Sequence, residues 1–229
     1  MATSPDTPAD LPPDGVRIAF VGKGGSGKST TAAHVLAHWG KDGIPCIGLD
    51  ADRPGDEEDG SLYTWANAVD IGAPVYPAPA VSHVAREAAR LTPPNGIALL
   101  DTGAWERRDG SPHAAVLAAV NLAVLCLPPT RMELERAGSV LGTLEHLRSI
   151  GAHAPRLVVL QTLVNPSARS GGTTREALTG AGFTVLTTVI PRQDAHDGYA
   201  QAFGRPPRVI PGSPMDHLAR ELLDLVAAG

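Results

Sequence analysis

Short apolar runs alternate along this chain with longer segments in which apolar and polar residues mix. Six runs have the length and β-branched content of strands: 16–21 (VRIAFV), 44–49 (IPCIGL), 97–101 (IALLD), 121–128 (NLAVLCLP), 156–164 (RLVVLQTLV) and 183–190 (FTVLTTVI). They are apolar on both faces, which is typical of parallel strands covered by helices on each side of a sheet.

The segments between these runs predict helices, at 28–40, 61–69, 80–91, 131–149, 172–181, 194–203 and 215–227. Strands and helices in alternation predict an α/β fold with a doubly wound, mostly parallel sheet, whose ligands bind beyond the carboxyl ends of the strands. Residues 1–14, rich in Pro, Asp and Thr, predict a disordered N-terminal tail, and residues 15–229 predict a single domain.

Charge and cysteine content narrow the classes of function. The net charge is −5 and the chain has only three lysines, so it is no globally basic nucleic-acid binder, and DNA contact would need a local cluster of arginines. No apolar run approaches the roughly 18 residues of a membrane span. Cys46 and Cys126 lie within apolar runs and no CxxC motif occurs, which predicts buried thiols and a cytoplasmic protein.

A glycine-rich motif directly follows the first predicted strand. Residues 22–29 read GKGGSGKS and match G-x-x-x-x-G-K-[ST], with a predicted helix after them. In such a loop the backbone N–H groups surround phosphate oxygens, Lys28 reaches the outer phosphates and the Ser29 hydroxyl can bind Mg²⁺. The motif therefore predicts a nucleoside triphosphate site made by Gly24, Gly25, Ser26, Gly27, Lys28, Ser29 and Thr30.

Lys23 gives this loop a second ammonium group. Two ammonium groups about 4 Å apart repel by roughly 1–4 kcal/mol, depending on the dielectric, and a polyphosphate would relieve that repulsion. Electrostatics alone leaves two interpretations open, in which Lys23 either contacts a phosphate or points to solvent.

Three aspartates stand at the ends of predicted strands. Asp50 and Asp52 end the segment IPCIGLDAD, and Asp101 ends IALLD. A carboxylate at the end of a buried strand is costly unless a cation or hydrogen bonds compensate it. Facing a triphosphate, the three predict Mg²⁺ binding and positioning of a water, although Mg²⁺ prefers few direct carboxylates. The alternative for Asp50 or Asp52 is that it caps a turn.

The segment KGGSGKST resembles the deviant Walker A signature K-G-G-x-G-K-[ST] of the ParA/MinD family of ATPases, and weaker similarity extends over most of residues 16–211. SLYTWANA and AGSV are similar to segments of the small, ParF-like partition proteins. The resemblance implies an ATP-sandwich homodimer in which Lys23 contacts the nucleotide of the partner subunit, so that ATP binding and dimerisation become one event.

The resemblance also assigns roles to other residues. It implies that Asp50 lies near Mg²⁺, that Asp52 orients or activates the attacking water, and that Asp101 reaches Mg²⁺ through water. Pro191, in the segment VIPRQDAHDGYAQAFGRPPRVI, would lie beside the adenine. One departure is that the family continues D-x-D with Pro-Gln, whereas this chain continues with 53–55 (RPG), which leaves the rate of hydrolysis open.

The function implied is that of a partition ATPase that segregates plasmid or chromosomal DNA. Slow hydrolysis would be stimulated by a centromere-binding partner protein, with non-specific DNA binding, nucleoid association and higher polymers as further expectations. Two other interpretations remain: a MinD-like spatial regulator of division or of another cargo, and a metabolic P-loop enzyme. The cysteine positions disfavour the last, because reductases and cluster carriers of this kind need exposed cysteines.

Two further features are interpreted as structural. His34 and His38 are four residues apart, a spacing that can bind zinc, but no third ligand accompanies them and a surface pair is expected. The C-terminal helix has an acidic polar face, which anionic lipid would repel, so it predicts a packing helix and no membrane binding. Gln161 or Thr162 could contact adenine or be a polar residue at a sheet end.

Overall fold

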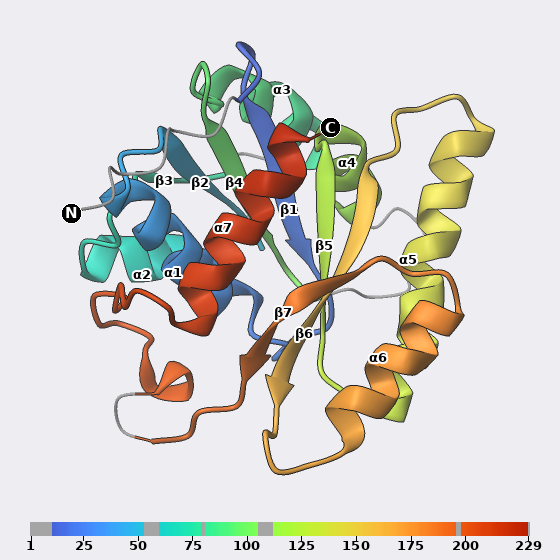
Figure 1. The fold of residues 1–229 in the computed structure, drawn as a ribbon. Coiled ribbons are helices and arrows are strands. Elements are labelled where there is room, and N and C mark those ends of the chain that lie inside the picture. Colours follow the sequence, from blue (N-terminus) through green and yellow to red (C-terminus); the bar gives the residue numbers. More distant parts are fainter. Residues whose placement is uncertain (1–10, 53–59, 79–80, 105–111, 196–197, 229) are drawn as a thin grey trace.

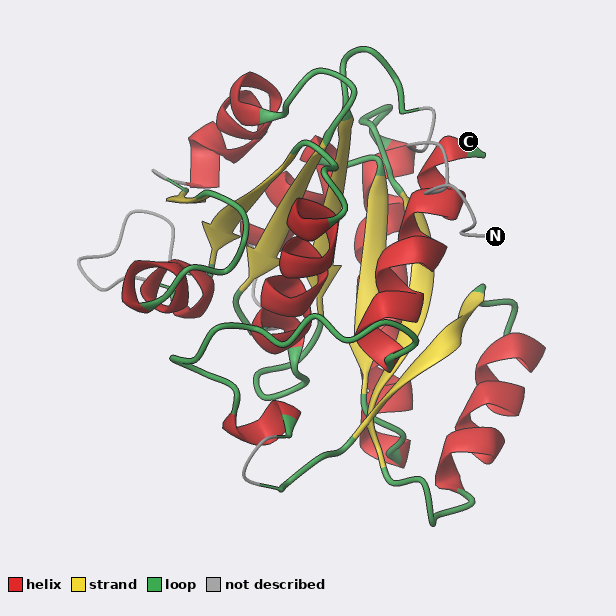
Figure 2. Ribbon diagram, turned by 60° about the vertical axis from the view of Figure 1, so that its left-hand side comes forward, coloured by secondary structure: helices red, strands yellow, loops and turns green. Residues whose placement is uncertain are grey.

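A seven-stranded parallel sheet with helices on both faces forms the centre of the molecule (Figures 1 and 2). The computed structural model describes residues 11–52, 60–78, 81–104, 112–195 and 198–228. The strand order is β3-β2-β4-β1-β5-β6-β7. This confirms the doubly wound α/β fold expected from the alternation of apolar runs.

The strands are β1 (Val16–Val21), β2 (Cys46–Ala51), β3 (Val75–Pro77), β4 (Ile97–Thr102), β5 (Leu122–Leu127), β6 (Arg156–Val164) and β7 (Val185–Pro191). The α-helices are α1 (Lys28–Lys41), α2 (Ser61–Ala68), α3 (Val84–Leu91), α4 (Pro112–Ala119), α5 (Arg131–Ser149), α6 (Ser170–Gly180) and α7 (Pro214–Ala227). Two short 3₁₀ helices are η1 (Val81–His83) and η2 (Tyr199–Gln201).

The sheet separates two apolar layers. Alternate residues of each strand point to opposite faces, so Ile18 and Phe20 of β1 pack into the layer under α1, α2 and α7, whereas Ala19 and Val21 pack into the layer under α3 to α6. Both layers are needed because strands that are apolar on both faces must be covered on both faces.

The position of β1 determines where a ligand can bind. β1 lies between β4 and β5, and the chain builds the sheet outward from it in both directions. The carboxyl end of β1 is therefore the topological switch point, where the connections on either side diverge and leave a crevice. The glycine-rich segment predicted to bind phosphate begins at this point, directly after Val21.

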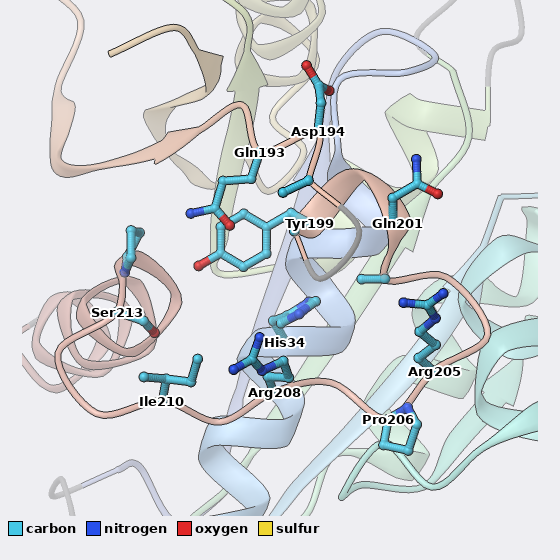
Figure 3. Close-up of a pocket in the computed structure, with 14 residues that line it drawn as sticks. His34, Gln193, Asp194, Tyr199, Gln201, Arg205, Pro206, Arg208, Ile210 and Ser213 are labelled. Atoms are coloured by element: carbon cyan, nitrogen blue, oxygen red, sulfur yellow. The ribbon is translucent and has the colours of Figure 1, made fainter.

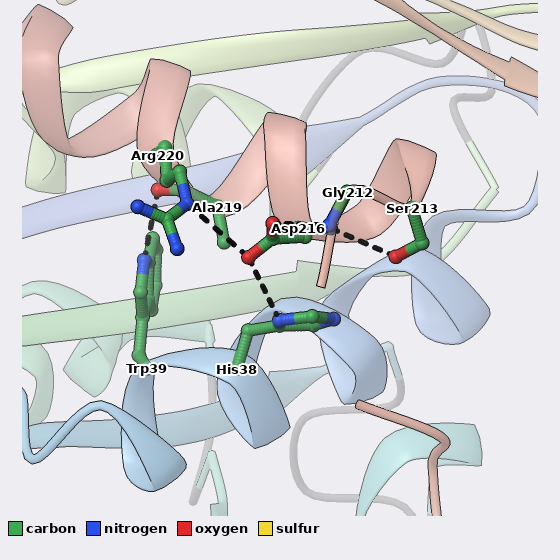
Figure 4. A network of polar contacts seen from close by, with 7 residues as sticks. All are labelled: His38, Trp39, Gly212, Ser213, Asp216, Ala219 and Arg220. Carbon is green, nitrogen blue, oxygen red and sulfur yellow. Dashed lines mark hydrogen bonds and ion pairs between the residues drawn. The ribbon is translucent and has the colours of Figure 1, made fainter. Parts of the chain in front are cut away.

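α1 is buried along most of its length because α7 packs directly along it (Figure 4). Trp39 donates its indole N–H to the carbonyl of Ala219 at 3.0 Å, and His38 Nδ1 lies 3.4 Å from an Asp216 carboxylate oxygen. Asp216 also accepts from the backbone N–H of Gly212 and from Arg220. These contacts confirm that the C-terminal helix is a packing helix.

The expectation of a surface pair at His34 and His38 is wrong. The two side chains are only 3% and 1% exposed, and burial lowers the pKa of both. Their side of α1 is covered by α7 and by the segment around Tyr199, which the local sequence does not reveal. Both residues are therefore part of the packing of α1 rather than of a surface.

The predicted helix at 194–203 is also wrong in its described part, where only η2 is helical. Gly198 is extended and packs so closely that a Cβ atom there would lie 2.5 Å from the Gln193 carbonyl oxygen, which ends any helix before η2. Two elements were missed. β3 has three residues at the sheet edge, and α4 is an apolar helix buried between neighbouring helices.

The chain packs against the sheet from Leu11 onward. Leu11 is buried in the core, and the carbonyl of Pro13 accepts a hydrogen bond from the backbone N–H of Asn95. Residues 1–10 of the predicted tail lie outside the described residues. In the described part of the chain, no helix is both long enough and apolar enough to cross a membrane.

We expect the contact between α1 and α7 to contribute strongly to stability. Leu222→Ala removes a fully buried side chain from α7 and should lower the free energy of unfolding by about 2–5 kcal/mol. Ile150→Ala, at a position 60% exposed, should change it by less than about 0.5 kcal/mol. Urea unfolding followed by circular dichroism measures both, and equal effects of the two variants would contradict the packing described.

Candidate phosphate-binding site

The glycine-rich loop turns tightly between β1 and α1. Gly22 has a φ angle of 145°, and a Cβ atom there would lie 2.6 Å from the Cys126 carbonyl oxygen, so the loop can leave β1 at this point only with glycine. Gly27 has a φ angle of 86° and precedes the first residue of α1. The loop thus directs backbone N–H groups and the helix N-terminus toward one point beyond the strand.

The two lysines of the loop lie in different environments. Lys28 is 6% exposed, and its ammonium donates to the carbonyls of Gly22 at 3.2 Å and Lys23 at 3.0 Å. The Lys23 side chain is exposed, although its carbonyl is part of this contact. Lys28 is thus held inside the loop, where phosphate oxygens could replace the carbonyls, and Lys23 is presented on the outer surface.

Asp50 and Asp101 lie side by side at the carboxyl edge of the sheet. They are register partners on the neighbouring strands β2 and β4, so their side chains point to the same face. Asp101 is fully buried, and neither of its carboxylate oxygens has a hydrogen-bond partner among the described residues. Burial raises the pKa of Asp101 to about 7, and the charge of Asp50 contributes to the rise while the nearby Ser29 and Lys28 oppose it.

This environment of Asp101 fits a hydrated magnesium ion. A buried carboxylate without donors is stabilised either by a proton or by a cation. No group of three or more His, Cys, Asp or Glu side chains in the described part of the chain is placed to hold a metal ion by itself. Mg²⁺ at this position would therefore take its remaining ligands from Ser29, phosphate oxygens and water, which agrees with its preference for few direct carboxylates.

Asp50 is held in place by the start of α2. Its carboxylate accepts hydrogen bonds from the backbone N–H groups of Tyr63 at 2.7 Å and Asp52 at 3.0 Å. A Cβ atom on Gly60 would lie only 2.1 Å from an Asp50 oxygen, so glycine is required there. Burial raises the pKa of Asp50 and these N–H groups oppose the rise. Asp50 thus caps the start of α2, which supports the capping alternative, and its place near Mg²⁺ stays a prediction.

The structure places Asp52 next to the segment after β4. A Cβ atom on Gly103 would lie 2.5 Å from an Asp52 carboxylate oxygen, and Thr102 donates its hydroxyl to the carbonyl of Phe20 at 2.7 Å. Gly60, Gly103 and Thr102 are residues that the sequence analysis missed. Gly103 comes two residues after Asp101 at a predicted strand end, and that position was the available signal for it, whereas Gly60 has no such local signal.

The end of β6 lies close to the phosphate loop. A Cβ atom on Gly27 would lie 4.0 Å from the Leu163 side chain, and Pro191 is the register partner of Val164 on the neighbouring strand β7. Gln161 is buried and donates its amide to the carbonyl of Gly171 at 2.8 Å, which supports the role of a polar residue at a sheet end. Pro191 therefore lies one strand further out than Leu163, and its place beside the adenine stays a prediction.

A cavity of about 490 Å³ lies beside α1, where His34 faces it (Figure 3). It is lined by His34, by η2 and by parts of 193–195 and 205–214. His34 forms an edge-on contact with Tyr199, with ring centres 5.2 Å apart, and its Nδ1 donates to the carbonyl of Thr30 at 2.8 Å. The cavity is therefore connected to the first turn of α1 through His34, although no residue of 22–30 lines it.

A glycine-rich loop with a buried lysine, placed at the switch point of a parallel sheet, defines the P-loop nucleotide-binding fold. No family model matches this chain, and no curated protein matches it in sequence. Solved structures share its fold. A cobyrinic acid a,c-diamide synthase from Mycobacterium smegmatis, with bound ATP analogue and magnesium, is similar with a TM-score of 0.65 and 17% identity, over 91% of this chain and 93% of that one.

Two further solved structures also share the fold. The MinD cell division protein of Aquifex aeolicus is similar with a TM-score of 0.64 and 15% identity, covering 93% of this chain and 97% of that one. A ParA family ATPase from Chlorobium tepidum TLS has a TM-score of 0.61 and 17% identity, covering 96% of this chain and 99% of that one. At these identities, the likeness shows that the chain has the ParA/MinD-like P-loop fold.

The raised pKa of Asp101 makes the stability of the nucleotide-free protein depend on pH. The folded state keeps a proton that the unfolded state releases above its ordinary pKa of 3.8, so the contribution of Asp101 to stability is fully present below that pKa and is lost as pH rises to about 7. At about 1.4 kcal/mol per pKa unit, the difference is worth on the order of 4 kcal/mol. Asp101→Asn, which is neutral throughout, should remove this fall. Chemical unfolding at pH 5 to 8 tests it, and parallel curves for both proteins would show that Asp101 ionises normally.

Gly60 should be intolerant of any side chain. Gly60→Ala places a methyl group against the Asp50 carboxylate and should lower the free energy of unfolding by about 1–3 kcal/mol, through overpacking of a buried site. Gly180→Ala is the matched control, because nothing lies within 4 Å of a Cβ atom at that position in α6, and it should stabilise by about 0.5–1 kcal/mol. Thermal unfolding of the two variants compares them directly, and a neutral Gly60→Ala would contradict the close contact.

Proposed function

We propose that this protein is a ParA-type ATPase that couples ATP binding to dimerisation and uses hydrolysis to reverse it, in the segregation of plasmid or chromosomal DNA. The observation that carries the proposal is the division of the two loop lysines, with Lys28 buried among the loop carbonyls and Lys23 exposed on its outer surface. A buried lysine can serve the nucleotide of its own subunit, whereas an exposed one is accessible to a second subunit.

ATP with Mg²⁺ is the proposed nucleotide complex. The synthase from Mycobacterium smegmatis was solved with an ATP analogue and magnesium, and a Cyanothece McdA variant was solved in complex with ATP. In this chain, the loop from Gly24 to Thr30 would bind the phosphates, and Ser29 and Asp101 would face the metal. The base would extend past the end of β6 toward Pro191, because Leu163 of β6 approaches the loop at Gly27 and Pro191 lies on the next strand.

Hydrolysis would depend on positioning and charge compensation rather than on covalent chemistry. Bound Mg²⁺ would neutralise charge on the phosphate oxygens. Lys28 would contact the outer phosphates, and Asp52, half-buried at the end of β2, would orient the attacking water. Asp50 would keep α2 in place beside the metal, through the hydrogen bonds that its carboxylate accepts from the backbone N–H groups of Tyr63 and Asp52. Slow turnover, stimulated by a partner protein, is part of the proposal.

Association with DNA is proposed to follow dimerisation. Exposed arginines stand just after the ends of strands on the ligand side of the sheet, at Arg169 after β6 and Arg192 after β7. By contrast, Arg175 donates to the carbonyl of Leu186 and so stabilises the fold. Non-specific binding by a few arginines per subunit should weaken steeply with salt. A small centromere-binding protein would connect the assembly to its cargo.

A spatial regulator of division is the second candidate, since MinD shares the fold. Acidic side chains hold α7 on the fold, since Asp216 is buried against His38 and Glu221 accepts from the backbone N–H groups of Thr187 and Thr188, which disfavours a membrane-bound regulator that would need this helix to bind lipid. This observation favours a DNA-based role over a membrane-based one.

The central test separates binding from dimerisation. Lys23→Ala should leave the affinity of the monomer for ATP within about threefold and abolish ATP-dependent dimers, because only the contact across the interface is lost. Lys28→Ala is the control and should weaken ATP binding itself. Sedimentation or light scattering with ATP, ADP or no nucleotide measures the dimers. Unchanged ATP-dependent dimers in Lys23→Ala would refute the proposed role of Lys23.

Adding DNA to the same samples tests the partition role. ATP-dependent DNA binding that falls steeply with salt is expected, and its absence with a non-hydrolysable ATP analogue would favour the regulator.

A further inference from the structure

His113 connects α4 to the segment that follows Asp101. It lies in the first turn of α4 and is 4% exposed, and its Nε2 lies 2.9 Å from the carbonyl oxygen of Ala104. A carbonyl oxygen only accepts, so Nε2 carries the proton and donates it. Ala104 comes three residues after Asp101, so its backbone carbonyl lies at the edge of the candidate site. The Ala104 side chain itself has no reactive group.

The short segment Gly103–Ala104 is packed between two parts of the proposed active site. On one side, a Cβ atom on Gly103 would lie 2.5 Å from an Asp52 carboxylate oxygen and 2.8 Å from the Asp52 carbonyl oxygen. On the other side, a Cβ atom on Gly24 would lie 3.3 Å from the Cβ of Ala104. The segment therefore touches both the proposed water-positioning carboxylate and the phosphate loop, next to Lys23.

Hydrogen bonds hold this segment at both ends. At its start, the Thr102 hydroxyl donates to the carbonyl of Phe20 at 2.7 Å, which fixes it to β1. At its end, the carbonyl of Ala104 accepts the hydrogen bond from His113. Removing the His113 donor would leave a carbonyl beside the site without this partner, and the segment could then shift away from Asp52 and Gly24.

We infer that His113 is a positioning residue for ATP hydrolysis, which holds Gly103–Ala104 against Asp52 and the phosphate loop. The inference rests on the proposed function. His113 lies in an otherwise apolar helix and would not contact the nucleotide. Its role would be to keep the residues that act in hydrolysis in their positions. Misplacement of reacting groups by about 1 Å can cost roughly a hundredfold in rate, so a single partly buried hydrogen bond at this position can matter.

Two substitutions separate the hydrogen bond from the bulk of the ring. His113→Phe keeps an aromatic ring of similar size and removes the donor. His113→Gln places an amide nitrogen close to the position of Nε2 and should restore the bond in part. Trp39→Phe is the matched control, because it also removes a buried ring N–H that donates to a backbone carbonyl, at a position where α1 meets α7 and away from the phosphate loop.

The expected result is a loss of turnover without a loss of binding. His113→Phe should lower kcat about tenfold or more and change the dissociation constant for Mg²⁺-ATP by less than about threefold, and His113→Gln should recover part of kcat. Trp39→Phe should lower the melting temperature while leaving kcat within about twofold. An unchanged kcat in His113→Phe, or an equal loss in Trp39→Phe, would overturn the inference.

A second measurement does not depend on activity. Hydrogen exchange at the backbone amides of Gly103 and Ala104, in the protein without nucleotide, should be faster in His113→Phe than in the parent and intermediate in His113→Gln. Equal exchange in all three would also overturn the inference. A parent protein that neither binds nor hydrolyses ATP would instead refute the proposed function, and with it this role for His113.

Discussion

A buried carboxylate without donors is the constraint on which the candidate site depends. Asp101 sits at the end of β4 inside the sheet, and neither of its oxygens has a hydrogen-bond partner among the described residues. Water cannot stabilise its charge there, and a neighbouring carboxylate, Asp50, makes that charge still less favourable. The fold therefore maintains a position where a cation lowers the free energy. The phosphate loop that would bring such a cation with its nucleotide begins one strand away.

The stretches that carry the site were predictable because each depends on local chemistry. Gly22, Gly27 and Lys28 belong to one contiguous motif, and Asp50 and Asp101 end two apolar strands, so their convergence follows from the parallel sheet alone. Apart from the short edge strand β3, the strands were predictable for the same reason, as were most helices, since their periodicity is a property of adjacent residues.

What the sequence could not reveal depends on contacts between distant segments. Gly60 is required because the Asp50 carboxylate approaches it, and His113 faces the carbonyl of Ala104, yet neither relation has a local signature. His34 and His38 were misjudged because α7 and η2, far away in the chain, cover their side of α1. The missed α4 is apolar all round, which gives a helix no periodic pattern to detect.

Contacts of Trp65 connect α2, the first helix α1 and the segment around Arg205. Its indole N–H donates to the carbonyl of Arg205, and its ring packs edge-on against His34, which itself is bonded to the first turn of α1. Trp65 lies in α2, and the first turn of α2 donates a backbone N–H, that of Tyr63, to the Asp50 carboxylate. A natural fluorophore thus stands between the helix that Asp50 caps and the cavity along α1, so the emission of this indole offers a label-free optical readout of how α2 sits on the sheet.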